Sequence, residues 1–282
     1  MMHPLNLCRQ LKSHIQDVLS DPRFESAWSD PVLYRIRAEL LLASIDASEK
    51  FLLPVGGSLM SDPQLRGIID TEKLSLPFDH VALEFLNPPT TTLNDGALLS
   101  TKSIIFLYQD DTHIKGAGAQ WLNDQRVWNL GGWWQMARST SELEQDSGGV
   151  LYWVHGLRSE YEKMHNISLP ERREIQPDAD VMLDFLNILG CSNVGTEAIG
   201  ARQKSAKHCK NAQPFDSYRV LTVGGEASHA TGSGGGSHRS PREHVRRGHI
   251  VRPQGRRPFW RNATVVNAGI GGRVDKDYRM TA

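Results

Sequence analysis

Cysteine is scarce in this 282-residue chain: there are three, Cys8, Cys191 and Cys209, and no two have the CxxC spacing. An odd number of cysteines without paired spacing argues against a disulfide framework and favours a reducing compartment. Long apolar runs are also absent, because no stretch approaches the roughly 20 apolar residues that a membrane span needs. Residues 1–20 lack the apolar run of a secretory signal. We therefore expect a cytoplasmic protein with no membrane partner.

The motifs of common enzyme classes are missing as well. There is no dinucleotide fingerprint and no GxSxG elbow, and Gly116-Ala117-Gly118 and Gly131-Gly132 are too short to be phosphate-binding loops. One set of carboxylates stays open as an alternative. Glu84 on one predicted strand and Asp110-Asp111 after another would bind a divalent ion if they converged, although strand-end carboxylates are more often solvated. We expect no cofactor and no bound metal, and the sequence leaves open whether the chain is an enzyme.

The net charge is zero, with 32 basic and 32 acidic side chains, but the two signs are separated along the chain. Residues 1–200 carry 16 Lys and Arg against 27 Asp and Glu, whereas residues 201–282 carry 16 against 5. A chain polarised in this way can bring a basic surface to a polyanion while its acidic part keeps it soluble. The alternative is that the two parts dock on each other and their charges pair internally.

The apolar patterns predict an α+β fold with N-terminal helices, a mainly antiparallel, aromatic-rich sheet and a basic C-terminal β module. One helix is expected over 5–19, and a second begins at Asp30-Pro31, an acceptor followed by proline at the first helical position. Strands are expected between residues 80 and 154, where five of the seven tryptophans lie, and we interpret these rings mainly as sheet core. The expected core stripe of the second helix is Leu33, Ile36, Leu40, Ala43 and Ala47.

Composition divides the chain into three parts. We predict an acidic α+β domain over 1–194, a linker over 195–216, and a basic β module over 217–282. A helix following Pro177 belongs to the first part and stops near Gly190, a residue typical of helix ends. The strands of the basic module either complete the sheet or form a small barrel of their own, since their edges need partners.

The most unusual stretch is 237–249, which packs three histidines and four arginines into thirteen residues. Eight arginines lie between residues 239 and 261. Arginine forks suit phosphate oxygens, and an aromatic ring beside them can stack on a base. The predicted nucleic-acid-binding residues are Arg239, Arg242, Arg246, Arg247, Arg252, Arg256, Arg257 and Trp260.

His238, His244 and His249 admit three interpretations. They would bind a metal ion only against the repulsion of neighbouring arginines, and their spacing matches no standard zinc pattern. His244 and His249 have the chemistry of an acid and a base for RNA cleavage without metal, with an arginine stabilising the phosphorane. The third interpretation is structural, in which the imidazoles bond to backbone carbonyls and fix the shape of the stretch.

The segment from His238 to His249, followed by Gly255-Arg256-Arg257, Trp260 and Val265-Val266-Asn267, resembles a C-terminal signature of uncharacterised phage and prophage proteins. Leu76-Pro77-Phe78, with Glu84 on the next strand, is similar to a weaker feature of the same family. The resemblance implies a phage context, in which roles in replication, host takeover or counter-defence are common.

We therefore expect a phage-encoded binding protein whose Arg/His-rich C-terminal surface engages DNA, RNA or a nucleoprotein complex. The first alternative is an interaction protein that binds and inhibits a host defence protein through the acidic, tryptophan-rich first 200 residues. The second is a metal-independent ribonuclease. Oligomeric state is left open by the sequence.

Overall fold

The computed structural model describes residues 5–27, 29–57, 59, 74–88, 100–123, 125–138, 144–146, 149–151, 154–157, 163, 172–199, 217–223, 244–246, 249–251, 253–261 and 264–266. Its helices are α1 (Leu7–Ser20), α2 (Phe24–Ala27), α3 (Pro31–Ala47) and α5 (Arg172–Leu189). No helix among these residues is both long and apolar enough to cross a membrane.

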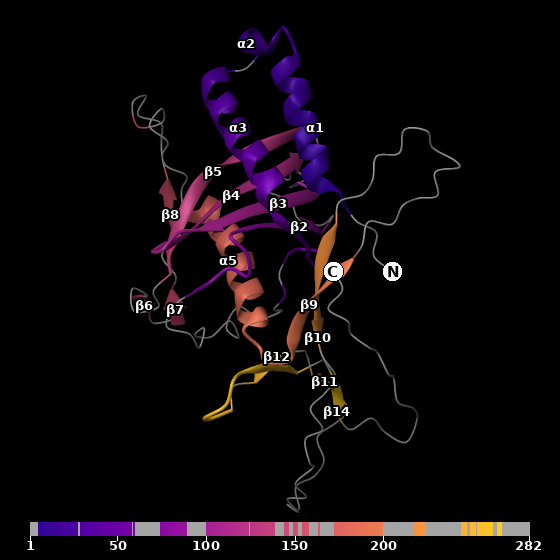
Figure 1. The fold of residues 1–282 in the computed structure, drawn as a ribbon, viewed down its shortest axis with the longest axis vertical. Helices are drawn as coiled ribbons and strands as arrows, with labels where there is room; N and C mark the ends of the chain where they lie inside the picture. The colour runs from indigo at the N-terminus through magenta and orange to yellow at the C-terminus, as the bar shows by residue number, and fades with distance from the viewer. Residues whose placement is uncertain are drawn as a thin grey trace, which may run out of the picture.

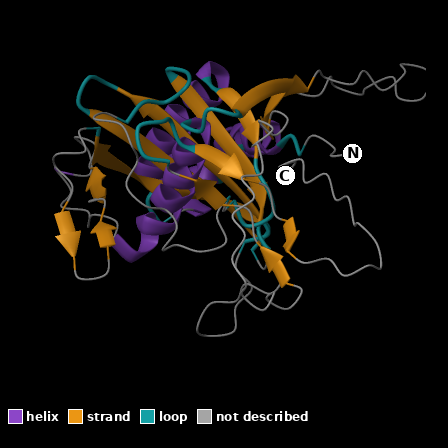
Figure 2. Ribbon diagram, turned by 90° about the horizontal axis from the view of Figure 1, so that it is seen from below, coloured by secondary structure: helices purple, strands orange, loops and turns teal. Residues whose placement is uncertain are grey.

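The centre of the molecule is one eight-stranded sheet in the order β8-β5-β4-β3-β2-β1-β10-β9 (Figures 1 and 2). Strand β1 runs parallel to both of its neighbours, and every other neighbouring pair is antiparallel. The α+β prediction with a mainly antiparallel sheet is therefore confirmed. The strands of this sheet are β1 (Glu49–Leu52), β2 (His80–Leu86), β3 (Lys102–Gln109), β4 (His113–Leu122), β5 (Val127–Ala137), β8 (Val154–Leu157), β9 (Val194–Ile199) and β10 (Tyr218–Val223).

Three two-stranded ribbons lie outside this sheet in the described part of the chain. They pair β6 with β7, β11 with β14, and β12 with β13, all antiparallel. Their strands are β6 (Glu144–Asp146), β7 (Gly149–Leu151), β11 (His244–Arg246), β12 (His249–Val251), β13 (Phe259–Arg261) and β14 (Thr264–Val266).

Helices α1 and α3 cover one face of the sheet (Figure 1). Helix α3 begins as predicted, because the Asp30 side chain accepts a hydrogen bond from the Leu33 amide and Pro31 occupies the first helical position. The prediction of its core stripe was wrong. The buried residues are Tyr34, Ala38, Leu41 and Ile45, whereas Leu40 is exposed. Apolar residues occur all around this helix, so its sequence contains two candidate stripes and tertiary contacts select one.

Helix α5 packs on the opposite face and forms a second core with apolar residues of β2, β3, β4 and β5. Phe185 of α5 meets Phe51 of β1 edge to face, with ring centroids 4.9 Å apart. Trp134 belongs to this core, while Trp128 and Trp133 belong to the core under α1 and α3, and all three are buried. For these three tryptophans the interpretation as sheet core is confirmed.

The C-terminal part does not begin as a separate unit. Residues 195–199, expected as the start of a linker, lie in strand β9, which pairs along its length with β10. Strand β10, expected to open the basic module, lies between β1 and β9 within the main sheet. Of the two arrangements considered for this strand, completion of the sheet is the one observed. The remainder of the expected linker, 200–216, lies outside the described residues.

Candidate functional site

The hairpin β12–β13 carries Arg256, Arg257 and Trp260, the predicted nucleic-acid-binding residues whose side chains the structure describes. Ile250 pairs with Trp260 and Val251 with Phe259, and residues 253–258 form the connecting turn. The Arg256 amide donates to the Pro253 carbonyl at 3.3 Å. Gly255 has a φ of +70°, a conformation that L side chains rarely adopt, so glycine suits this position.

Trp260 fastens the hairpin to the body of the protein. Its side chain is 7% exposed and belongs to the core under α5. Asn193, just after α5, donates from Nδ2 to the Trp260 carbonyl at 2.8 Å and accepts from the Trp260 amide at 2.8 Å. The Ser192 amide also donates to the Pro258 carbonyl at 2.8 Å. The expectation that Trp260 stacks on a base is therefore corrected: this indole packs in the core and fixes the hairpin.

Arg256 and Arg257 lie in the turn, and both are exposed. Neither forms an ion pair or a hydrogen bond from its guanidinium to any described residue. Arg261, on β13, lies 5.7 Å from the centroid of the Phe259 ring. The turn therefore presents two guanidinium groups to solvent on a hairpin whose base is held in the core.

The other predicted binding residues are placed only in part. Arg246 and His244 lie in β11, which pairs with β14, whereas His249 lies in β12. His244 and His249 thus belong to two different ribbons, and their side chains lie outside the described part. The remaining predicted residues lie entirely outside the described part of the chain, backbone included: Arg239, Arg242, Arg247, Arg252 and His238.

Glu84 is fully enclosed, with a relative exposure of 0%. Its carboxylate accepts hydrogen bonds from the Leu7 amide at 2.9 Å, the Cys8 amide at 2.9 Å and the Tyr218 hydroxyl at 2.8 Å. Burial raises the pKa of Glu84, and these hydrogen bonds oppose that shift. The carboxylate joins the first turn of α1 to β2 and β10, where the free amides of a helix start attract negative charge.

The alternative left open by the sequence, in which Glu84 and Asp110-Asp111 converge on a divalent ion, is wrong. Glu84 is paired with Ile104 of β3, and Asp110 lies six residues further along, about 20 Å away at the usual rise of a strand. Asp110 is partly exposed and is bonded to Lys115 at 2.8 Å, and this bond and the His113 and Thr112 amides hold its pKa well below the usual range. In the described segments, no three potential metal ligands lie together.

Asp178 on α5 is a group that sequence reasoning did not single out. A Cβ atom at Gly118 of β4 would lie 2.3 Å from Asp178 Oδ2, so the carboxyl group lies directly over the backbone of the sheet. Burial raises the pKa of Asp178 to about 7. No hydrogen bond links this carboxyl group to any other described residue.

Glycines make room for Asp178 at a bulge in the sheet. The register between β4 and β5 shifts at Gly118, which lies opposite Gly131 and Gly132. A Cβ at Gly131 would lie 2.8 Å from the Gly118 carbonyl oxygen. The Trp134 ring packs directly on Gly116, where a Cβ atom would lie 2.3 Å from the ring. The indole N–H of Trp134 has no hydrogen-bond partner among the described residues. The sequence did contain a signal for this arrangement. Gly116, Gly118, Gly131 and Gly132 lie within strands, where glycine indicates a bulge or the close approach of another group.

Comparison with known proteins does not add a function, because no family model, no curated protein and no solved structure matches this chain. The candidate groups are therefore ranked by their geometry. Glu84 and Asp110 are occupied by hydrogen bonds within the protein. Asp178 faces the sheet at Gly118, whereas Arg256 and Arg257 present charge to solvent without a described partner.

Proposed function

We propose that this chain is a phage-encoded binding protein of the cytoplasm whose Arg/His-rich C-terminal surface engages nucleic acid or a nucleoprotein complex. The observation that carries the proposal is the turn between β12 and β13, where Arg256 and Arg257 are exposed without a described carboxylate partner. Internal pairing of these two arginines with the acidic first 200 residues was the competing expectation, and no such pair is found in the described segments.

In the proposed interaction, the arginines neutralise phosphate charges from a hairpin that is already fixed in position. Guanidinium groups form charge-assisted, bidentate bonds with phosphate oxygens. The hairpin is held by the buried Trp260 and by Asn193, so binding would not require ordering of its backbone. Contacts of this kind carry little sequence information, so we expect binding to DNA and RNA with weak discrimination by base.

The test is a binding titration against salt. Fluorescence anisotropy of labelled single strands and duplexes gives log Kd at several salt concentrations for the wild-type protein and for Arg256→Gln/Arg257→Gln. Each phosphate contact contributes a slope of roughly 0.7–0.9, so the double variant should bind more weakly and show a slope lower by about 1.4–1.8. The matched control is Arg23→Gln/Arg126→Gln, which removes the same charge from two other exposed positions. Absence of binding at low ionic strength, or equal loss in the control, would contradict the proposal.

The alternative of a host-protein inhibitor depended on exposed tryptophans in the first 200 residues. Trp128, Trp133 and Trp134 are buried, which removes them from a contact surface. Trp121 is partly buried, with its ring 5.8 Å from Trp128. The described tryptophans therefore do not favour that alternative over polyanion binding.

A further inference from the structure

Helix α3 is apolar on two faces, and the sheet and α1 use only one of them. Val32 and Leu40 are 46% and 44% exposed, and both lie on the side away from the buried residues Tyr34, Ala38 and Leu41. We call the apolar residues on this exposed side the outer stripe: Val32, Ile36, Leu40, Ala43 and Ala47. Successive members are three or four residues apart, so they lie along a single face of the helix.

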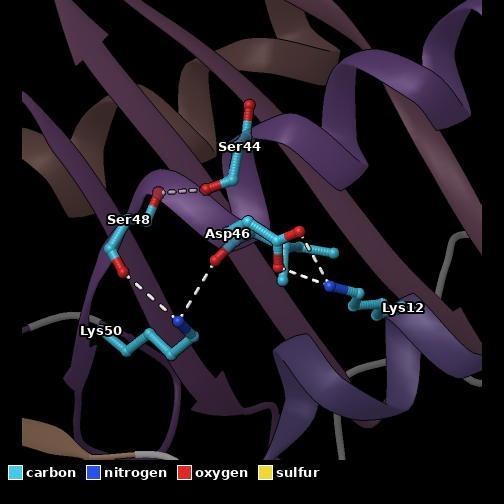
Figure 3. A network of polar contacts seen from close by, with 6 residues as sticks. Lys12, Ser44, Asp46, Ser48 and Lys50 are labelled. Carbon is cyan, nitrogen blue, oxygen red and sulfur yellow. Dashed lines mark hydrogen bonds and ion pairs between the residues drawn. The ribbon is translucent and has the colours of Figure 1, made fainter.

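Salt bridges flank both ends of the outer stripe. Near the start of α3, Arg35 bonds to Glu25 at 2.8 Å. Near its end, Asp46 accepts two bonds from Lys12 of α1, at 2.5 and 2.8 Å. Figure 3 shows Lys12 reaching across from α1 to Asp46. Arg35 and Asp46 lie eleven residues apart, about three helical turns, so they share one flank of α3 with opposite charges at its two ends.

We propose that the outer stripe of α3 binds a second copy of this chain, in a two-fold contact between antiparallel α3 helices. About a two-fold axis near Leu40, Val32 of one copy faces Ala47 of the other, and Ile36 faces Ala43. Large side chains thus meet small ones on either side of the axis, where the two Leu40 side chains meet each other, and this permits close packing of the two helices. A two-fold contact must be self-complementary in this manner, because one surface serves both partners.

Charge complementarity also selects a second copy as the partner. In the antiparallel arrangement, Arg35 of each copy lies near Asp46 of the other, so the dimer has two such contacts, one at each end. Each contact then places four charges in alternating sign along Lys12, Asp46, the second copy's Arg35 and its Glu25. The backbone at this end of α3 is capped by side chains that follow the helix, since Ser48 Oγ donates to the Ser44 carbonyl and Lys50 donates to the Ile45 carbonyl (Figure 3).

One residue opposes the contact. Glu39 is exposed and lies beside Leu40, so the two Glu39 side chains approach each other near the two-fold axis. The contact is also small, because a 17-residue helix is about 25 Å long and presents a single face. We therefore expect a dimer at the weak end of specific interfaces, with a dissociation constant on the order of micromolar. In Figure 1 helix α3 lies toward the opposite end of the molecule from β12, so a contact through α3 leaves the arginine turn free.

Sedimentation velocity over a range of protein concentrations tests the contact. The wild-type protein should shift from the monomer mass to twice that mass as concentration rises. Leu40→Glu should raise the dissociation constant by about 100-fold or more, since it removes both leucines from the contact and adds two carboxylates beside the two Glu39 side chains in each dimer. Val55→Glu changes the most exposed large apolar side chain described, which lies outside α3, and should leave the dimer intact. Circular dichroism establishes that each variant is folded.

A charge-exchange experiment separates this dimer from any other association. Arg35→Glu and Asp46→Arg should each weaken self-association, because each places two like-charge contacts in its own homodimer. An equimolar mixture of the two variants should form mixed dimers, since both contacts then join opposite charges, and native mass spectrometry distinguishes the species. A wild-type protein that stays monomeric at high concentration, a dimer unaffected by Leu40→Glu, or random mixing of the two charge variants would overturn the proposal.

Discussion

The sheet and the β12–β13 turn use charged side chains in opposite ways. In the sheet, Glu84 is enclosed by three hydrogen bonds, and Arg219 of β10 is paired with Glu49 at 3.2 Å. In the turn, the guanidinium groups of Arg256 and Arg257 have no partner among the described residues. A buried charge must be satisfied by the protein itself, whereas an exposed unpaired charge costs little and remains available. The comparison teaches that substitutions in the sheet should affect stability, and substitutions in the turn should affect binding.

The largest effect is expected at Glu84. Glu84→Ala leaves two buried amides and the Tyr218 hydroxyl without their acceptor, so we expect a loss of about 4 kcal/mol in the free energy of unfolding. Urea denaturation followed by circular dichroism measures this loss. Glu49→Ala on the neighbouring strand β1 is the matched control and should cost at most about 1 kcal/mol, because its ion pair is exposed. Equal effects of the two substitutions would mean that the enclosed carboxylate does not hold α1 to the sheet.

A smaller, pH-dependent effect is expected at Asp178. Its pKa is raised by burial to about 7, so the folded state binds a proton that the unfolded state releases near pH 4. Stability contributed by the neutral form is therefore complete below about pH 4 and is lost as the pH rises toward 7. An asparagine at this position would stay neutral at every pH, so the Asp178→Asn variant does not lose this stability as the pH rises. Its free energy of unfolding should exceed that of the wild type by roughly 2 kcal/mol at pH 8 and should show no gain at pH 4.

Unfolding curves for the wild-type protein and Asp178→Asn at pH 4, 6 and 8 measure the difference between the two. Glu84 titrates in both proteins, so its contribution cancels in that difference. A constant difference across this range would show that Asp178 is charged in the folded protein or solvated beneath α5.

Local signals in the sequence predicted local structure well. The Asp30-Pro31 start of α3 and the tryptophan-rich strands follow from capping and from strand propensity. The sequence did not decide which face of α3 is buried, because Leu41 and Leu40 each belong to an apolar stripe. Contacts with the sheet made that choice.

Contacts between segments that are distant in the sequence explain the remaining differences between prediction and structure. Glu84 was expected as a strand-end carboxylate, but the first turn of α1 and Tyr218 come from 76 or more residues away to enclose it. Asp178 became notable only because α5 lies on Gly118, a contact that no local pattern encodes. Trp260 is in the core because Asn193 and the end of α5 receive the hairpin there. Each of these outcomes depends on pairings between distant segments.

The most direct test of the central claim observes the arginines themselves during binding. In a protein labelled with 15N-arginine, the side-chain Nε–Hε signals of Arg256 and Arg257 can be assigned by Arg→Lys substitution. On addition of a short oligonucleotide, both signals should shift strongly, while Arg219, which is paired with Glu49 and lies 4.7 Å from the Phe78 ring, should stay in place. Unchanged signals from Arg256 and Arg257 at saturating oligonucleotide would contradict the assignment of this turn to phosphate binding.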